Sequence, residues 1–200
     1  MQTITDIAAL EALYGQPGEA SLIKVADVVT PEYRAWIERS RLVVLITVGP
    51  EGTDGSPRGD SGPVVQVMDA QTLLLPDWRG NNRMDSLRNI VRDGRVSLMF
   101  LVAGSTNVIR VNGLAVLTVE PQMLARFDHD GASPRSVVVV QVAEVYSQCA
   151  RALMRAGVWE GRDDTAGLPS IGQILAAMKA GFDGGTYDAD WPGRAKTTMW

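Results

Sequence analysis

The stretch PVVQVMDAQTLLLP, residues 63–76, decides the fold, because it places two short apolar runs on either side of a brief polar turn. Such runs, bounded by turn residues, are typical of neighbouring β-strands. The same pattern predicts further strands at residues 42–48, 95–102, 107–119 and 137–146. About six strands joined mostly by short turns favour an antiparallel sheet that closes into a small barrel over a doubly wound parallel sheet.

Two of these strands carry further local signals. LVVLITV, residues 42–48, is continuously apolar and is expected to be buried on both faces. The polar PEGTDGSP that follows it is predicted to be a turn. In the long strand 107–119, Asn112-Gly113 indicates a bulge or a bend.

Helices are predicted to flank the sheet. The best signal is TPEYRAWIERS, where Thr30 can cap the helix and Pro31 suits its first position. Apolar spacing predicts others at 5–14, 83–93, 147–159 and 170–182, and the end of the chain, 183–200, reads as a loop whose two tryptophans pack on something. The expectation is a mainly β, α+β protein with one domain over 1–200: a helical segment 1–40, a barrel core 41–146 and a helical extension 147–200.

Composition narrows the function classes. Of 200 residues, 46% are hydrophobic and 21% charged, and the net charge of −4 argues against a nucleic-acid or anionic-membrane surface. No run approaches the roughly 18 apolar residues of a membrane span. Cys149 is the sole cysteine, so no intrachain disulfide can form; its apolar neighbours suggest a buried thiol. With no signal-peptide pattern at the start, a cytoplasmic location is expected.

Histidine chemistry is restricted to one residue, His129, in the Gly/Asp/Pro-rich stretch FDHDGASP. A Ser-His-Asp triad or a histidine-rich metal site would have to use it. A surface loop is the simpler expectation, and no metal site is predicted.

GNNRMDSLRNIV, residues 80–91, is the candidate site. A helix beginning near Asn82 would offer unpaired N–H groups, Gly80 would allow close approach, and Arg83 could grip two phosphate oxygens. Arg58 could converge on the same anion if its strand lies nearby. Alternatively, Gly-Asn-Asn is ordinary turn chemistry, and both arginines are solvated surface charges.

In this order, SPRGDSGPVV, LLLPDWRGNNRMDSLRNIV, VSLMFLV and IRVNGLA resemble the pyridoxamine 5′-phosphate oxidase-like family of FMN-binding split β-barrels. The tail YSQCARALMRAGVW resembles that of a subgroup of FMN-dependent proteins. The resemblance extends from about Leu42 to Trp159.

The resemblance implies FMN held at a homodimer interface. By this resemblance, the residues that hold the phosphate are Arg58, Asn82 and Arg83. Ser61 would lie near the flavin edge. Further contacts with the cofactor would come from Pro76 and Asp77. Where the family often has a ring-contacting glutamine, this chain has Val108. The C-terminal arginine–histidine pair of true pyridoxamine phosphate oxidases is also missing, so that activity is not expected.

Under this reading the protein is an FMN-dependent oxidoreductase acting on an unknown small molecule, with hydride transfer at flavin N5 as the most concrete step. Two alternatives stay open. One is a non-enzymatic carrier of flavin, deazaflavin or haem, although a lone loop histidine is a poor haem ligand. The other is a structural barrel with an empty pocket. Arg151 and Arg155, four residues apart on a predicted helix, either reach an anion or are solvated or paired with Glu144 and Glu160.

Overall fold

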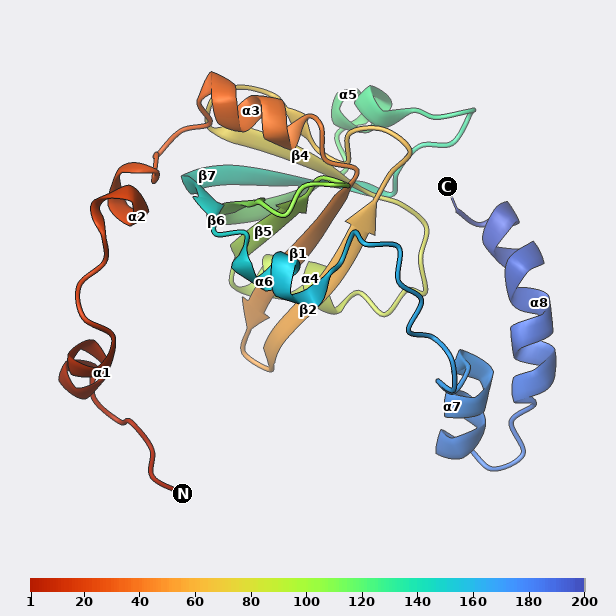
Figure 1. Cartoon of the computed structure of the whole chain (residues 1–200). Coiled ribbons are helices and arrows are strands. Elements are labelled where there is room, and N and C mark those ends of the chain that lie inside the picture. Colours follow the sequence, from red (N-terminus) through yellow and green to blue (C-terminus); the bar gives the residue numbers. More distant parts are fainter. Residues whose placement is uncertain (200) are drawn as a thin grey trace.

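The computed structural model describes residues 1–199 and is built on one seven-stranded sheet, all of whose paired strands are antiparallel. Figure 1 shows this sheet curling around the centre of the molecule. The strands lie in the order β2-β1-β5-β6-β7-β4-β3. Their bounds are β1 Leu42–Gly49, β2 Gly52–Gly59, β3 Gln66–Val67, β4 Thr72–Asp77, β5 Arg95–Leu101, β6 Val108–Thr118 and β7 Ser136–Gln148.

Strand β2 corrects one expectation, because most of the predicted turn at residues 50–57 belongs to this strand, whose residues 52–59 pair along their whole length with β1. The actual turn is confined to the Gly49–Gly52 end of this hairpin. Glycine and proline are poor strand formers, so the pairing of β2 with the apolar β1 must outweigh the local preference. The hairpin of residues 63–76 does form, although β3 has only two paired residues.

One face of the sheet is buried in the hydrophobic core, and the other face is only partly covered. In β1, Val43 and Leu45 are fully buried, whereas Val44 and Ile46 between them are only partly covered. The expectation that 42–48 is buried on both faces was therefore wrong in degree. The alternation follows from the two-residue period of a strand, which sends successive side chains to opposite faces.

Helices cover the ends of the curled sheet. Helix α3, Pro31–Ile37, is capped by Thr30 and buries Ile37 completely, and α4, Asp85–Arg92, packs across β1 and β2. The other helices are α1 Ile7–Tyr14, α2 Glu19–Ile23, α5 Pro121–Leu124 with a following 3-10 turn at Ala125–Phe127, α6 Arg151–Ala156, α7 Ile171–Met178 and α8 Gly184–Thr197. The expected helix at 147–159 is shorter, because β7 continues to Gln148.

The end of the chain was predicted as a loop, but α8 occupies most of it. The helix is capped by Asp183 and lies against α7, where Gly172 and Gly184 bring the two backbones together. Asp188 accepts hydrogen bonds from Gly172 N, at 2.8 Å, and from Ser170 Oγ. Trp191 is 53% exposed rather than packed, and Trp200 lies outside the described residues.

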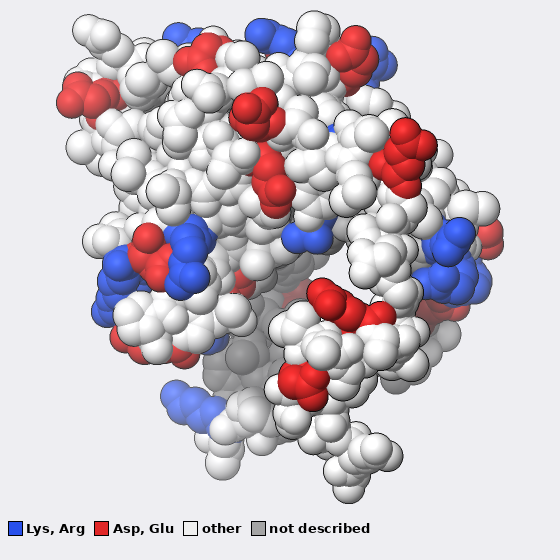
Figure 2. All heavy atoms as spheres, turned by 90° about the vertical axis from the view of Figure 1, so that its left-hand side faces the viewer, with Lys and Arg blue, Asp and Glu red and all other residues white. Residues whose placement is uncertain are grey.

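Both terminal regions extend away from the barrel, with α1 and α2 on one side and α7 and α8 on the other (Figure 1). Helices α1 and α8 contain no buried residue. On the face seen in Figure 2, basic and acidic side chains are interspersed rather than gathered by sign. None of the described helices is long and apolar enough to cross a membrane.

The only histidine and the only cysteine of the sequence both lie outside the strands. His129 lies in a loop, where its backbone bridges Ala132, as expected. Cys149 is exposed, contrary to the expectation of a buried thiol, because it follows Gln148, the residue at which β7 ends.

A bulge bends the long β6–β7 ladder. Asn112 pairs with Glu144 but Gly113 pairs with Val142, which leaves one extra residue on β7. A Cβ atom on Gly113 would lie 2.1 Å from the Gln141 carbonyl oxygen, so only glycine fits. The predicted bend at Asn112-Gly113 is thus confirmed, with its cause in this close approach.

Replacing Gly113 by alanine is expected to lower the free energy of unfolding by about 3 kcal/mol, because backbone must move to admit the methyl group. Chemical denaturation measures the change. The matched control is Gly62→Ala, where no atom lies within 4 Å of the added Cβ. It should change stability by less than about 0.5 kcal/mol. Equal effects at the two positions would contradict the assignment of the bulge.

Candidate functional site

A cavity of about 720 Å³ opens where β2, the end of β4, the loop before α4 and the start of β7 meet. Its polar lining includes four arginines and three aspartates, Arg58, Arg79, Arg83 and Arg135 with Asp54, Asp77 and Asp85. The described lining therefore carries an excess of one positive charge. Met199, just beyond α8, also lines it, so the end of the described chain returns to the barrel at this point.

Arg58 and Asp77 form the central ion pair of the cavity. Arg58 comes from β2 and Asp77 from the end of β4, two strands with four others between them in the sheet. The two side chains are only 21% and 13% exposed. The Nε of Arg58 is buried and has no hydrogen-bond partner among the described residues. A buried guanidinium donor without an acceptor is costly, and an anionic ligand in the cavity would relieve that cost.

The loop between β4 and α4 has an unusual backbone. Asn82 and Met84 both have positive φ, 60° and 61°, on either side of Arg83. Left-handed conformations at residues other than glycine cost on the order of 1 kcal/mol and tend to cluster at functional sites. The Arg83 N–H donates to Asn81 Oδ1 at 3.0 Å, which fixes the turn. Met84 occupies the N-cap position of α4, and its side chain accepts no hydrogen bond from the helix. The first N–H groups of α4 therefore have no capping side chain as an acceptor.

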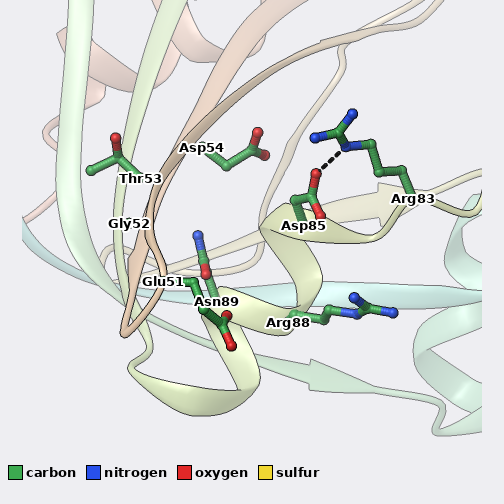
Figure 3. Close-up of a pocket in the computed structure, with 8 residues that line it drawn as sticks. All are labelled: Glu51, Gly52, Thr53, Asp54, Arg83, Asp85, Arg88 and Asn89. Atoms are coloured by element: carbon green, nitrogen blue, oxygen red, sulfur yellow. Dashed lines mark hydrogen bonds and ion pairs between the residues drawn. The ribbon is translucent and has the colours of Figure 1, made fainter.

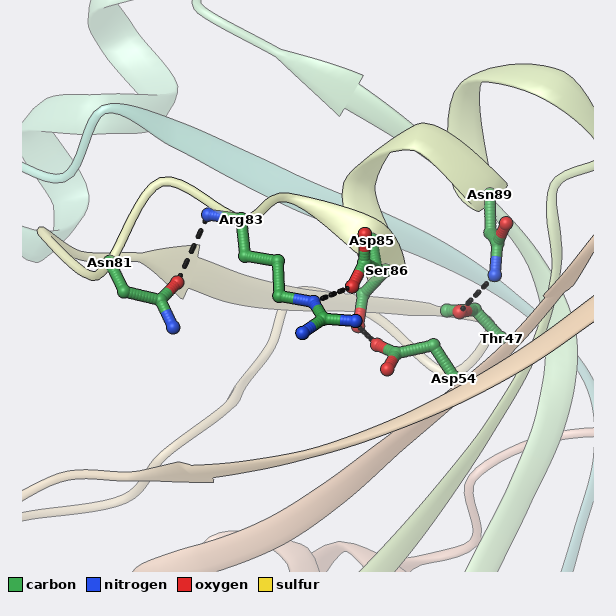
Figure 4. A network of polar contacts seen from close by, with 7 residues as sticks. All are labelled: Thr47, Asp54, Asn81, Arg83, Asp85, Ser86 and Asn89. Atoms are coloured by element: carbon green, nitrogen blue, oxygen red, sulfur yellow. Dashed lines mark hydrogen bonds and ion pairs between the residues drawn. The ribbon is translucent and has the colours of Figure 1, made fainter. Parts of the chain in front are cut away.

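Arg83 lies at the mouth of the cavity and is 79% exposed. Its Nε donates to Asp85, and this hydrogen bond, together with the charge of Asp85, raises the pKa of Arg83. Arg83 is therefore cationic at every physiological pH, but a neighbouring carboxylate offsets its charge. Figure 4 shows the guanidinium turned back over Asp85.

Hydrogen bonds anchor α4 to the sheet beneath the cavity (Figure 4). Ser86 Oγ donates to Asp54 of β2, and the buried Asn89 donates through Nδ2 to Thr47 Oγ1 of β1 at 3.1 Å. Gly49 makes room for Asn89, since a Cβ there would lie 2.2 Å from Asn89 Oδ1. These contacts hold the start of α4, and with it the preceding loop, against the edge of the barrel.

A smaller cavity of about 260 Å³ lies beside the first and shares Asp54, Arg83 and Asp85 with it. Figure 3 shows Arg88 and Glu51 on its far side from the shared residues. Because the two cavities share a wall, we treat the smaller one as a side chamber of the same site.

Five of the six residues expected to contact a cofactor line the large cavity, namely Arg58, Pro76, Asp77, Asn82 and Arg83. Ser61 does not. It is exposed beyond the end of β2, where its Oγ donates to Asp60 at 3.3 Å. Ser61 was predicted from a looser match to the family pattern. It lies two residues past Gly59, the last β2 residue that lines the cavity.

Among the lining residues that were not predicted, three carry large polar side chains, Trp78, Arg79 and Arg135. Trp78 and Arg79 stand inside the stretch singled out from the sequence and could have been included for that reason. Arg135 had no such signal, because it is far along the chain in a loop before an apolar strand.

Arg151, Arg155 and Trp159 do not line either cavity. The two arginines are exposed on α6, and neither pairs with a carboxylate among residues 1–199. Trp159 donates from Nε1 to the Ser105 carbonyl oxygen at 2.7 Å, which ties the segment after α6 to the β5–β6 loop.

Comparison with known proteins identifies the family of this chain. The family model of pyridoxamine 5′-phosphate oxidase matches residues 29–149, more than half of the chain, and the protein belongs to that family. The matched region includes all seven strands and every predicted cofactor residue. No curated protein matches the chain.

Solved structures are similar at low sequence identity. A variant of HupZ from Group A Streptococcus is 17% identical, with a TM-score of 0.51 over 60% of this chain and 99% of that one. An FMN-binding protein from Syntrophomonas wolfei is 14% identical, with a TM-score of 0.45 over 58% and 83% of the two chains. General Stress Protein 26 from Bacillus anthracis is 15% identical, with a TM-score of 0.43 over 56% and 88%. The likeness to HupZ supports the split-barrel fold.

Removing Asp77 tests the central ion pair. Asp77→Ala should lower the free energy of unfolding by about 2 kcal/mol, because it leaves the largely buried Arg58 guanidinium without a carboxylate partner. A double-mutant cycle with Arg58→Ala should show coupling of about 1 kcal/mol or more. The control pair is Arg162 and Asp164, whose side chains are 61% and 71% exposed. Its cycle should give less than about 0.5 kcal/mol.

Proposed function

We propose that this protein is a flavoprotein that binds FMN in the large cavity and acts as an oxidoreductase on a small molecule. The observation that carries the proposal is the buried Nε of Arg58, which lacks a partner and lies in an arginine-lined cavity. An anion bound there would accept from that N–H. The phosphate of FMN suits the site, since arginine matches phosphate oxygens in charge and geometry.

The dimensions and the polarity of the cavity also support a cofactor. Its volume falls within the range of about 300–1,000 Å³ that is typical of small-molecule sites. The residues proposed to hold the phosphate are Arg58, Asn82 and Arg83, while Pro76 and Asp77 would line the rest of the cofactor. Bound FMN would supply the redox chemistry, and the chain would supply binding, orientation and charge.

A homodimer is part of the proposal, because the outer face of the sheet has the character of an interface. Val44, Ile46 and Met99 are half-buried there, although they are apolar. On the same face, Arg110 Nε and Gln148 Oε1 are buried and lack partners among the described residues. A mixture of apolar surface and unsatisfied buried polar atoms is what a second subunit would complete.

The substrate is proposed to differ from that of the vitamin-salvage oxidases. Those enzymes hold it with an arginine–histidine pair, and the one histidine here, His129, does not line the cavity. A small molecule that reaches the flavin through the open side of the cavity is the substrate class that we propose.

The absorbance spectrum of the purified protein tests the cofactor. We expect a yellow protein, or a colourless one that binds added FMN and quenches its fluorescence. The double variant Arg58→Ala/Arg83→Ala should lose at least about 100-fold in affinity, since it removes two charge-assisted hydrogen-bonding groups. The control Arg39→Ala/Arg162→Ala removes two exposed arginines outside the cavity and should bind FMN as before. A wild-type protein that ignores FMN would refute the proposed function.

A reduction assay then separates an enzyme from a carrier. NADPH, NADH and a reduced deazaflavin are each added without oxygen to the FMN-loaded protein. Bleaching of the flavin absorbance at a saturable rate by one of them indicates an oxidoreductase. A flavin that stays oxidised with all three favours a binding protein instead.

Sedimentation equilibrium tests the dimer. Met99→Glu places a charge on the outer sheet face and should convert a dimer into a monomer, because the charge would be buried without a partner. Val119→Glu is the matched control, since Val119 is 69% exposed beyond the end of β6. If the site lies at the interface, Met99→Glu should also weaken FMN binding. A monomeric wild-type protein would contradict the dimer.

A further inference from the structure

Arg135 is an arginine that sequence patterns did not single out, and the structure places it in the cavity. It immediately precedes β7, and its backbone N–H donates to the Asp77 carbonyl oxygen at 3.0 Å. The next residue, Ser136, pairs with Asp77 in the β4–β7 ladder. The backbone of Arg135 is therefore fixed by the strand that also provides the carboxylate partner of Arg58.

The side chain of Arg135 is directed by a second contact. Its Nη1 donates to Asn82 Oδ1 at 2.6 Å, which joins the start of β7 to the loop before α4. Asn82 is one of the two left-handed residues of that loop. This hydrogen bond thus links the guanidinium of Arg135 to the same loop that carries Arg83.

Charge balance distinguishes Arg135 from the arginines predicted earlier. Arg58 is paired with Asp77, and Arg83 is paired with Asp85. Among residues 1–199, no carboxylate lies within ion-pair distance of Arg135 or Arg79. The arginines of the cavity that have no ion-pair partner are therefore these two, while the remaining carboxylate of the lining, Asp54, accepts a hydrogen bond from Ser86. Of the two, Arg135 alone is held by both a backbone and a side-chain hydrogen bond.

We infer that Arg135 is the residue that selects a phosphorylated ligand, with Asn82 orienting its guanidinium toward the anion. This inference rests on the proposed function, because it concerns the same cavity. A phosphate dianion needs more positive charge than two already neutralised arginines provide, and Arg135 supplies it from the start of β7. Asn82 acts here as a positioning residue.

The test compares FMN with riboflavin, which has the same ring but no phosphate. Dissociation constants for both are measured by fluorescence quenching with the wild-type protein, Arg135→Ala and Arg135→Gln. Loss of one charged hydrogen-bonding group should weaken FMN binding by roughly 10- to 100-fold. Riboflavin binding should change by less than about threefold, so the preference for FMN should fall in both variants. Arg135→Gln keeps a donor for Asn82 and guards against a folding defect in the alanine variant.

Two controls make the result specific. Arg39→Ala removes an exposed arginine outside the cavity and should leave the FMN-to-riboflavin ratio unchanged. Asn82→Ala should reduce the ratio less than Arg135→Ala does, because the charge remains. If wild-type protein prefers FMN and both Arg135 variants keep that preference, the inference is overturned while the proposed function stands. If the wild-type protein binds neither flavin, the proposed function itself fails, and the inference with it.

Discussion

The ion pair between Arg58 and Asp77 is the contact on which the site depends. It joins β2, at one edge of the sheet, to β4, near the other, and only a strongly curled sheet allows the two to meet. Because a largely buried charge is tolerated only with a partner, the pair fixes how far the sheet closes. The cavity is the gap that this closure leaves between β2 and β4, and its arginines follow from the strands that border it.

Most of the barrel could be predicted from the sequence, because its strands are apolar runs separated by turn residues. The exceptions have physical causes. In β2, GTDGSPRG has no apolar alternation, and it is extended only because β1 offers it a complete ladder. Helix α8 was not predicted, because its sequence is only weakly amphipathic and contains Pro192. The cap at Asp183 and the packing on α7 stabilise this helix. In both segments, tertiary contacts outweigh local preference.

Site residues that lie close together in the sequence could be predicted, whereas a residue that joins them only in the folded chain could not. Asn82 and Arg83 stand in one turn with recognisable chemistry, and Arg58 was placed by family resemblance. Arg135 is 53 residues from Asn82, and the two meet only because β7 pairs with β4. Nothing in the loop ASPRSV marks its arginine as different from any other exposed charge. A residue that reaches a site through strand pairing needs the sheet order before it can be found.

The uneven distribution of buried surface has a consequence for the motions of the chain. The strands hold nearly all of the fully buried side chains, whereas α1 and α8 have none. Local opening costs least where few apolar contacts are lost, so amide hydrogens of the terminal helices should exchange with solvent long before those of β5, β6 and β7. A protease should likewise cut first in the polar segment between α6 and α7, leaving the barrel whole. The molecule is thus a rigid barrel that carries independently opening ends, and one of them reaches the cavity through Met199.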